Sequence, residues 1–136
     1  MSAPTIGMMS AAAALHKAVL RVLAGDGPLR RLVGPGGISD RPAPTGTAGA
    51  HVLVGAITSA DWSTSTEAGE EHRLVVEVSG GAALLAVVAR VQTVLTGSAM
   101  TLPGQVLVNF EHRETRARRE KADMVFRAVT EPTTEY

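Results

Sequence analysis

The sequence contains no cysteine, and this absence excludes several kinds of site. Disulfide bonds, thiolate zinc sites and cysteine nucleophiles all require that residue. Aromatic residues make up only 3% of the 136 residues, whereas apolar residues make up 45%. The core must therefore be built from Val, Leu, Ile, Ala and Met. A chain of this length suits one compact domain and can bury about two-thirds of its unfolded surface.

The chain also lacks a net charge, because 13 basic residues balance 13 acidic ones. Nucleic-acid-binding domains normally carry a basic excess, so we do not expect a dedicated domain of that kind. No apolar run approaches the ~18 residues of a membrane span. The N-terminus has no basic region followed by an apolar block, which argues against a signal peptide. We therefore expect no membrane partner and an origin in the cytoplasm.

Two long segments and one short segment predict helices. The first helix begins after Ser10, a suitable N-cap, and its apolar residues recur with helical spacing as far as Gly25. Asp26 and Pro28 then predict the cap and first turn of a short second helix. The other long helix is predicted over residues 82–96. Its buried stripe is expected to consist of Leu84, Val87, Val88, Val91, Val94 and Leu95.

Four segments have the apolar pattern of strands. These predicted strands are residues 51–58, 72–79, 105–115 and 124–130. The first is apolar on both faces, which predicts a central position in the sheet. In the second, every other residue from Leu74 onward is apolar, so one face is buried. In the third, Val106, Val108 and Phe110 are expected to share one face.

The last two strands are predicted to form a hairpin. A turn centred near Arg118 would place Phe110 opposite Phe126 and Arg113 opposite Asp123, and both are favourable cross-strand pairs. One amphipathic helix precedes each pair of strands, which makes the order α, short α, β, β, α, β, β. The economical architecture is an α+β fold with a four-stranded, mainly antiparallel sheet and two helices packed on one face.

No internal repeat or domain boundary divides the chain. We expect a flexible lead-in over residues 1–9, a single domain over residues 10–131 and a frayed end over residues 132–136. Residues 34–50 are rich in Gly, Pro and Thr and predict a long irregular connection. Connections of this length are often functional or become ordered by a partner.

The sequence shows no recognisable catalytic or metal-binding motif. The four histidines lack metal-ligand spacing, and we interpret them as exposed or edge residues. The Gly-Pro-Gly-Gly run at residues 34–37 lacks the strand, lysine and helix of a phosphate-binding loop. Glu67, Glu70 and Glu71 cluster in a polar loop with no apolar surroundings to raise a pKa. We therefore expect no enzyme, no cofactor and no metal.

Two segments are candidates for interaction. Trp62, the single tryptophan, lies in a polar loop predicted over residues 59–71, where it either pins the loop to the core or anchors an interface. Residues 112–121 interleave basic and acidic side chains. They form either a solvated hairpin tip or an arm that reaches a neighbouring subunit or lines a pore that carries DNA.

Four short motifs stand out along the chain. They are Asp40-Arg41-Pro42, Asp61-Trp62-Ser63-Thr64, Gly69 with Glu71-His72, and Phe126-Arg127 followed by Thr130-Glu131-Pro132. Together with the order of helices and strands, they resemble the tail-completion, or tail-terminator, family of long-tailed phages and phage-like gene transfer agents. The resemblance spans about residues 11–132. Family members often carry Pro-Tyr where this chain has Ala50-His51.

This resemblance implies a structural subunit of a hexameric ring at the head-proximal end of the tail tube. The ring would stop growth of the tube protein and join the tube to a head-tail connector or stopper protein. DNA would pass through its lumen, in a virion assembled in the bacterial cytoplasm. We predict that the interface includes Asp40, Arg41, Asp61, Trp62, Arg113, Arg116, Arg118, Arg119 and Lys121.

Two other functions remain open at this point. A different neck component, such as a head-tail stopper or connector, would share the size, the charge balance and the lack of an active site. A ferredoxin-like regulatory domain would bind a small ligand in a concave apolar pocket. Nothing in the sequence marks such a pocket.

Overall fold

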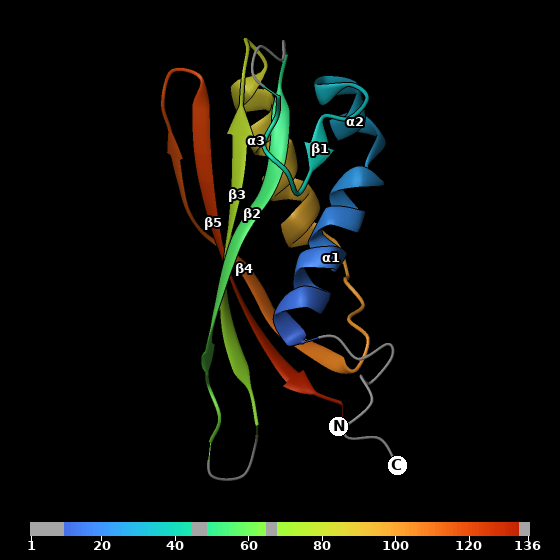
Figure 1. The fold of residues 1–136 in the computed structure, drawn as a ribbon, viewed down its shortest axis with the longest axis vertical. Coiled ribbons are helices and arrows are strands. Elements are labelled where there is room, and N and C mark those ends of the chain that lie inside the picture. The colour runs from blue at the N-terminus through green and yellow to red at the C-terminus, as the bar shows by residue number, and fades with distance from the viewer. Residues whose placement is uncertain (1–9, 45–48, 65–67, 134–136) are drawn as a thin grey trace.

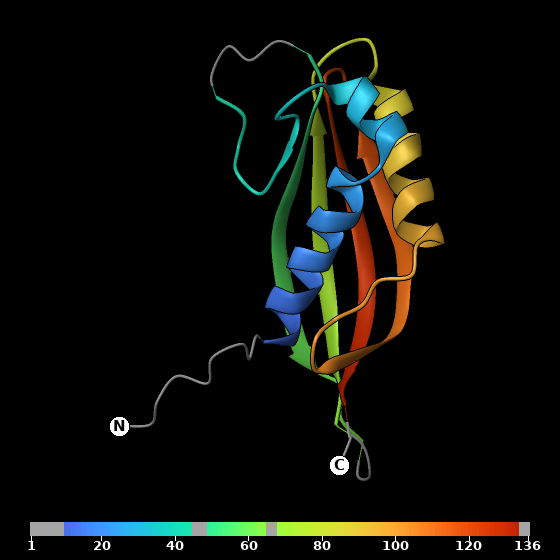
Figure 2. The same cartoon turned by 90° about the vertical axis from the view of Figure 1, so that its right-hand side faces the viewer.

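The computed structural model describes residues 10–44, 49–64 and 68–133. In chain order, the elements are α1 (Ala11–Ala24), α2 (Gly27–Val33), β1 (Ile38–Ser39), β2 (His51–Asp61), β3 (Glu70–Ser79), α3 (Leu84–Gly97), β4 (Gln105–Ala117) and β5 (Lys121–Pro132). Figure 1 and Figure 2 show the helices on one face of a twisted sheet; within the described ranges the other face carries no helix. The predicted α+β class and the order of its main elements are confirmed.

The two predicted terminal segments lie mostly outside the described residues. Residues 1–9 and 134–136 lie outside them, as do residues 45–48 of the predicted connection. At the C-terminal side, β5 runs to Pro132, and the backbone N–H of Thr133 donates to Gly104 O at 3.0 Å. None of the helices in the described ranges is long and apolar enough to cross a membrane.

The sheet has five strands in the order β1-β2-β3-β5-β4. All neighbours are antiparallel except β1, which pairs parallel with the start of β2. The four-stranded prediction missed β1, because two residues inside a Gly- and Pro-rich connection cannot show an alternation. The backbone N–H of Val52, which donates to Gly37 O at 2.7 Å, holds this segment against β2.

The prediction that residues 51–58 form a central strand holds only for the start of that strand. The central strands are β3 and β5, and β2 has a second neighbour only where Ile38 and Ser39 pair with it. His51 and Val52 point to opposite faces and are both buried beside β1. From Thr58 onward the strand is mostly exposed. Its apolar first half therefore reflects its place in the core under α1 and beside β1.

The two predicted caps set the starts of α1 and α2. Ser10 Oγ accepts a hydrogen bond from the N–H of Ala13, and the Asp26 carboxylate accepts one from Leu29, both at 3.0 Å. Asp26 also receives two hydrogen bonds from the Arg90 guanidinium in α3, each at 2.8 Å. The Arg90 hydrogen bond holds the pKa of Asp26 below its usual value. One ionised side chain thus caps α2 and ties it to α3.

The core lies between the helices and the covered face of the sheet. The predicted stripe of α3 is buried at all six positions. In β3 and β5 the buried residues alternate as predicted: Leu74, Val76 and Val78 on β3, and Ala122, Met124, Phe126 and Ala128 on β5. Phe126 stacks on Phe110, with 5.4 Å between ring centroids. The scarcity of aromatic residues therefore leaves one aromatic pair within a core of aliphatic side chains.

Strand β4 departs from the predicted pattern because it contains two β-bulges. They lie at Val108 and Arg113, where β4 has one residue more than β5. The first bulge turns Phe110 toward the core, whereas Val106 and Val108 are about half exposed, at 50% and 49%. The prediction that these three residues share a face was wrong, since one extra residue reverses the alternation of all that follow.

The register of the β4–β5 hairpin also differs from the predicted one. Phe110 lies opposite Ala128 instead of Phe126. Asp123 lies opposite Arg116, because the turn is centred between Arg119 and Glu120 and not near Arg118. The predicted turn centre was therefore displaced, and the bulge at Arg113 changes the count by one further residue before Phe110 is reached.

Gly80, directly after β3, should not tolerate a side chain. Its φ is 89°, and a Cβ there would lie 2.1 Å from the carbonyl oxygen of Gly49. We expect Gly80→Ala to lower the free energy of unfolding by about 2 kcal/mol or more, from the strained backbone and the clash together. Gly97→Ala is the matched control, because a Cβ at Gly97 meets nothing within 4 Å. Urea unfolding followed by circular dichroism measures both, and equal stability of the two variants would contradict the close approach.

Candidate interaction surfaces

The structure distributes the predicted interface residues over three places. Asp40 and Arg41 are exposed directly after β1, where Ser39 Oγ donates to Arg41 O at 2.8 Å. Asp61 and Trp62 lie at the end of β2. The remaining residues, Arg113, Arg116, Arg118, Arg119 and Lys121, follow the β4–β5 hairpin toward the other end of the sheet. The predicted set is therefore not one continuous surface.

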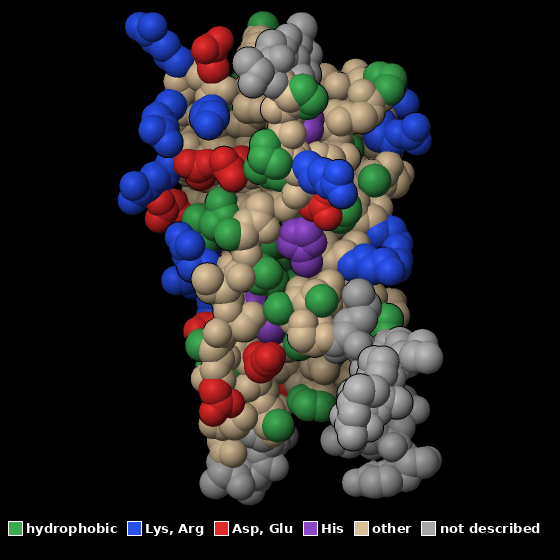
Figure 3. Space-filling view, viewed as in Figure 1, with side chains coloured by type: hydrophobic (Ala, Val, Ile, Leu, Met, Phe, Trp, Pro, Cys, Tyr) green, Lys and Arg blue, Asp and Glu red, His purple; other side chains and the backbone are tan. Residues whose placement is uncertain are grey.

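The β4–β5 hairpin carries a line of cations along one edge of the molecule (Figure 3). Arg116 pairs with Glu114, and Arg118 pairs with Asp123 at 3.4 Å. Both pairs are largely exposed, so each contributes little to stability. Arg119 and Lys121 have no ion pair among the residues that the structure describes. The hairpin can therefore exchange its own acidic partners for external ones at low cost.

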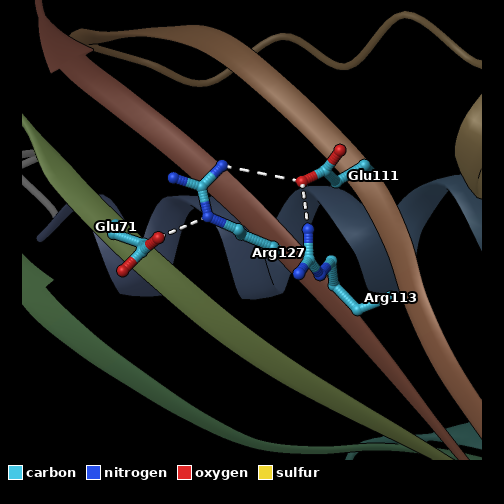
Figure 4. Close-up of polar contacts among 4 residues, drawn as sticks. All are labelled: Glu71, Glu111, Arg113 and Arg127. Carbon is cyan, nitrogen blue, oxygen red and sulfur yellow. Dashed lines mark hydrogen bonds and ion pairs between the residues drawn. The ribbon is translucent and has the colours of Figure 1, made fainter.

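An ion-pair network crosses the uncovered face of the sheet. Arg127 on β5 lies between Glu71 on β3 and Glu111 on β4, as Figure 4 shows. Arg113 also contacts Glu111, at 3.1 Å. The network joins three neighbouring strands by their side chains. Arg113, which we predicted as an interface residue, is therefore already engaged within its own subunit.

The end of β2 presents Trp62 to solvent. Its backbone N–H donates to Gly69 O at 2.8 Å, and its ring carbon Cε3 lies 3.4 Å from where a Cβ on Gly69 would be. The side chain is 46% exposed. Of the two alternatives for this residue, packing into the protein's own core is thus excluded. The role as an interface anchor remains a prediction.

Asp61, beside Trp62, is held in its ionised form. Ser63 donates to its carboxylate twice, from the hydroxyl at 2.6 Å and from the backbone N–H at 3.1 Å. These hydrogen bonds keep the pKa of Asp61 below its usual value. The exposed carboxylate is therefore oriented as well as charged.

His72 forms a buried polar centre near the same end of the sheet. Its Nδ1 lies 2.7 Å from Ser59 Oγ, and its Nε2 lies 2.9 Å from Thr130 Oγ1. The interpretation of the histidines as exposed or edge residues was wrong for His72 and for His51, which are both buried. The missed signal was the alternation itself, since His72 precedes Leu74 by two residues and so shares its buried face.

The uncovered face is also hollowed, but its lining is charged. A hollow of about 520 Å³ lies among Thr58, Arg73, Arg113 and Arg127. Small-molecule pockets are lined mainly by apolar side chains, so this hollow does not favour the small-ligand alternative. Within the described ranges, no group of His, Asp and Glu side chains is placed to hold a metal ion.

Comparisons with known proteins identify the family and a similar solved structure. The family described as tail completion protein gp17 matches residues 17–133. The chain belongs to this family. A chain of a solved structure titled "Virion of native gene transfer agent (GTA) particle" is 34% identical, and the match covers 90% of this chain and 99% of that chain with a TM-score of 0.79. Among curated proteins none matches. The resemblance found in the sequence is confirmed, and the protein is a structural component of a phage-like tail.

His72 should make the stability of the fold depend on pH. Burial lowers the pKa of its imidazole below the usual 6.5. At a pH just below 6.5 the unfolded chain therefore binds a proton that the folded chain refuses. The stability is fully present above that pH and is lost as the pH falls toward the lower pKa of the folded state.

The measurement is urea unfolding between pH 8 and pH 5, for wild type and for His72→Gln. The amide keeps hydrogen-bonding capacity but does not titrate. We expect the variant to be less stable at pH 8 and to lose less stability on acidification, by up to about tenfold in the unfolding constant per pH unit. The other histidines are common to both proteins and cancel in the difference. Parallel pH profiles would show that His72 does not titrate in this way.

Proposed function

We propose that this chain is the terminator of a phage-like tail. Its subunits form a ring, six-fold by the family resemblance, on the head-proximal end of the tail tube. The ring stops growth of the tube and joins it to the head-tail connector, and DNA passes through the lumen. The family match over residues 17–133 carries the proposal, supported by the 34% identity to a chain of a gene transfer agent particle.

The surfaces are suited to such a role. A closed ring requires heterologous contacts, in which two different patches of each subunit meet. The chain offers a long cationic hairpin at one end of the sheet and an exposed tryptophan with carboxylates at the other. It therefore acts by binding on several sides and not by catalysis. The near balance of acidic and basic side chains would let DNA pass without being held.

Polymerisation of the tail tube protein tests the proposal. Tubes grown with increasing amounts of this chain should become shorter, and negative-stain images should show a ring at one end of each tube. The tube protein alone, polymerised under identical conditions, is the control. A chain that leaves tube length unchanged but binds a portal-side protein would be a stopper or connector. A chain that binds neither would not be a neck component.

A further inference from the structure

Although the net charge is zero, the two ends of the sheet carry opposite charges. Residues 61–72 and 128–136 contain acidic residues and none of the 13 lysines and arginines. The sheet brings the described parts of these segments together, because Asp61 pairs with Glu70, and Glu70 pairs with Thr130. We define the acidic end by Asp61, Trp62, Glu70, Val106, Val108 and Glu131.

The acidic end contains an arrangement that is unfavourable in an isolated subunit. Asp61 and Glu70 lie directly opposite each other on antiparallel strands, where like charges are destabilising. Neither they nor Glu131 form an ion pair with any residue in the described ranges. Ser63 holds Asp61 in the charged form. An external cation between these carboxylates would relieve their repulsion.

A hollow at the acidic end has room for such a cation. Its volume is about 310 Å³, and Asp61 and Glu70 line it together with Ser10 at the start of α1. The positive end of the α1 dipole partly offsets the carboxylates, but it is equivalent to only about half an elementary charge. The hollow therefore remains negative and would receive the head group of an arginine or lysine.

The uncovered face at this end carries exposed apolar side chains, whereas Asp61 and Glu70 line the hollow on the helix side. Trp62, Glu131 and Val106 lie in one row across the sheet. Trp62 pairs with Gly69, Val106 pairs with Glu131, and the residues next to Gly69 and Glu131 (Glu70 and Thr130) pair with each other. Trp62, Val106 and Val108 are each about half exposed. Strands β3 and β5 lie between Trp62 and the two valines, so the apolar side chains are distributed across this end of the sheet. Tryptophan is a frequent anchor of protein interfaces.

The opposite end of the same sheet carries the complementary charge. We define the basic tip by Arg118, Arg119 and Lys121, which are all exposed at the turn of the β4–β5 hairpin. Ser79, at the end of β3, pairs with Lys121. The ten residues of β3 thus separate the two ends by roughly 30 Å at ~3.3 Å per residue.

We propose that the acidic end of one subunit binds the basic tip of a second copy of the chain. The contact joins unlike surfaces, so it is heterologous and leaves an unused basic tip and an unused acidic end for further copies. The proposal rests on the proposed ring, for which it names the contact between neighbours. Trp62 is buried against the hairpin of the next subunit, and basic side chains of that hairpin lie beside Asp61 and Glu70.

Paired charge reversals test the contact. Arg118→Glu with Arg119→Glu reverses the basic tip, and Glu70→Lys with Glu131→Lys reverses the acidic end. Each double variant alone should stay monomeric, since its two ends now repel. Mixed in equal amounts they should assemble, because each end of one variant meets an opposite charge on the other, and the two variants should alternate around the ring. Lys17→Glu with Arg21→Glu on the exposed side of α1 is the control and should assemble as wild type does.

The readouts are the mass in solution by analytical ultracentrifugation and the emission of Trp62, the only tryptophan. Assembly should shift that emission to shorter wavelength. Salt at 1 M should weaken the assembly, because the Debye length is then only ~3 Å. Circular dichroism establishes that each variant is folded. The contact would be overturned if either double variant alone assembled as the wild type does. It would also be overturned if the mixture of the two variants stayed monomeric.

Failure of the contact is distinguishable from failure of the ring. If the wild type and each double variant all assemble on their own, only this contact is refuted and the terminator proposal remains intact. Wild type that remains monomeric, both alone and with the tail tube protein, would refute both proposals. Double variants that form rings but no longer bind the tube would assign the acidic end or the basic tip to the tube, and this also overturns the contact between copies.

Discussion

The unbroken pairing of β3 with β5 is the interaction on which the other parts of the structure depend. Ten residues of each strand pair without a shift in register, so the apolar residues of both strands fall on the same face. The helices cover that face because no other surface of comparable size needs burial. The same pairing separates the β2–β3 hairpin from the β4–β5 hairpin by the length of the sheet. The core and the distance between the two charged ends thus have one origin.

The outer strand β4 serves a different purpose from the central pair. Its two bulges interrupt the ladder and make the exposed edge a poor template for an additional strand. They also turn Phe110 toward the core and leave Val106 and Val108 about half exposed. The ion-pair network around Arg127 then joins β4 to β3 and β5 on the uncovered face. An edge that avoids uncontrolled pairing is what a subunit with defined neighbours requires.

The sequence was sufficient to identify most residues of the candidate site. It was not sufficient to predict how these residues group into surfaces. The charged run in residues 112–121, and Trp62 with Asp61 in a polar loop, are visible in the sequence. Their grouping is not, because Asp61, Glu70 and Glu131 meet only through two strand registers that join segments far apart in the chain. Counting charges over the whole chain therefore gave neutrality where the folded protein has two oppositely charged ends.

The sequence by itself determined the features that depend on neighbours within a few residues. The caps at Ser10 and Asp26, the buried stripe of α3 and the alternation of β3 and β5 follow from local periodicity and hydrogen bonding, and they were correct. Only the tertiary structure decided the short strand β1, its pairing with the start of β2, the bulges of β4 and the burial of His72 against Ser59 and Thr130. Each of these depends on which distant segment lies alongside, and packing of the whole sheet selects that partner.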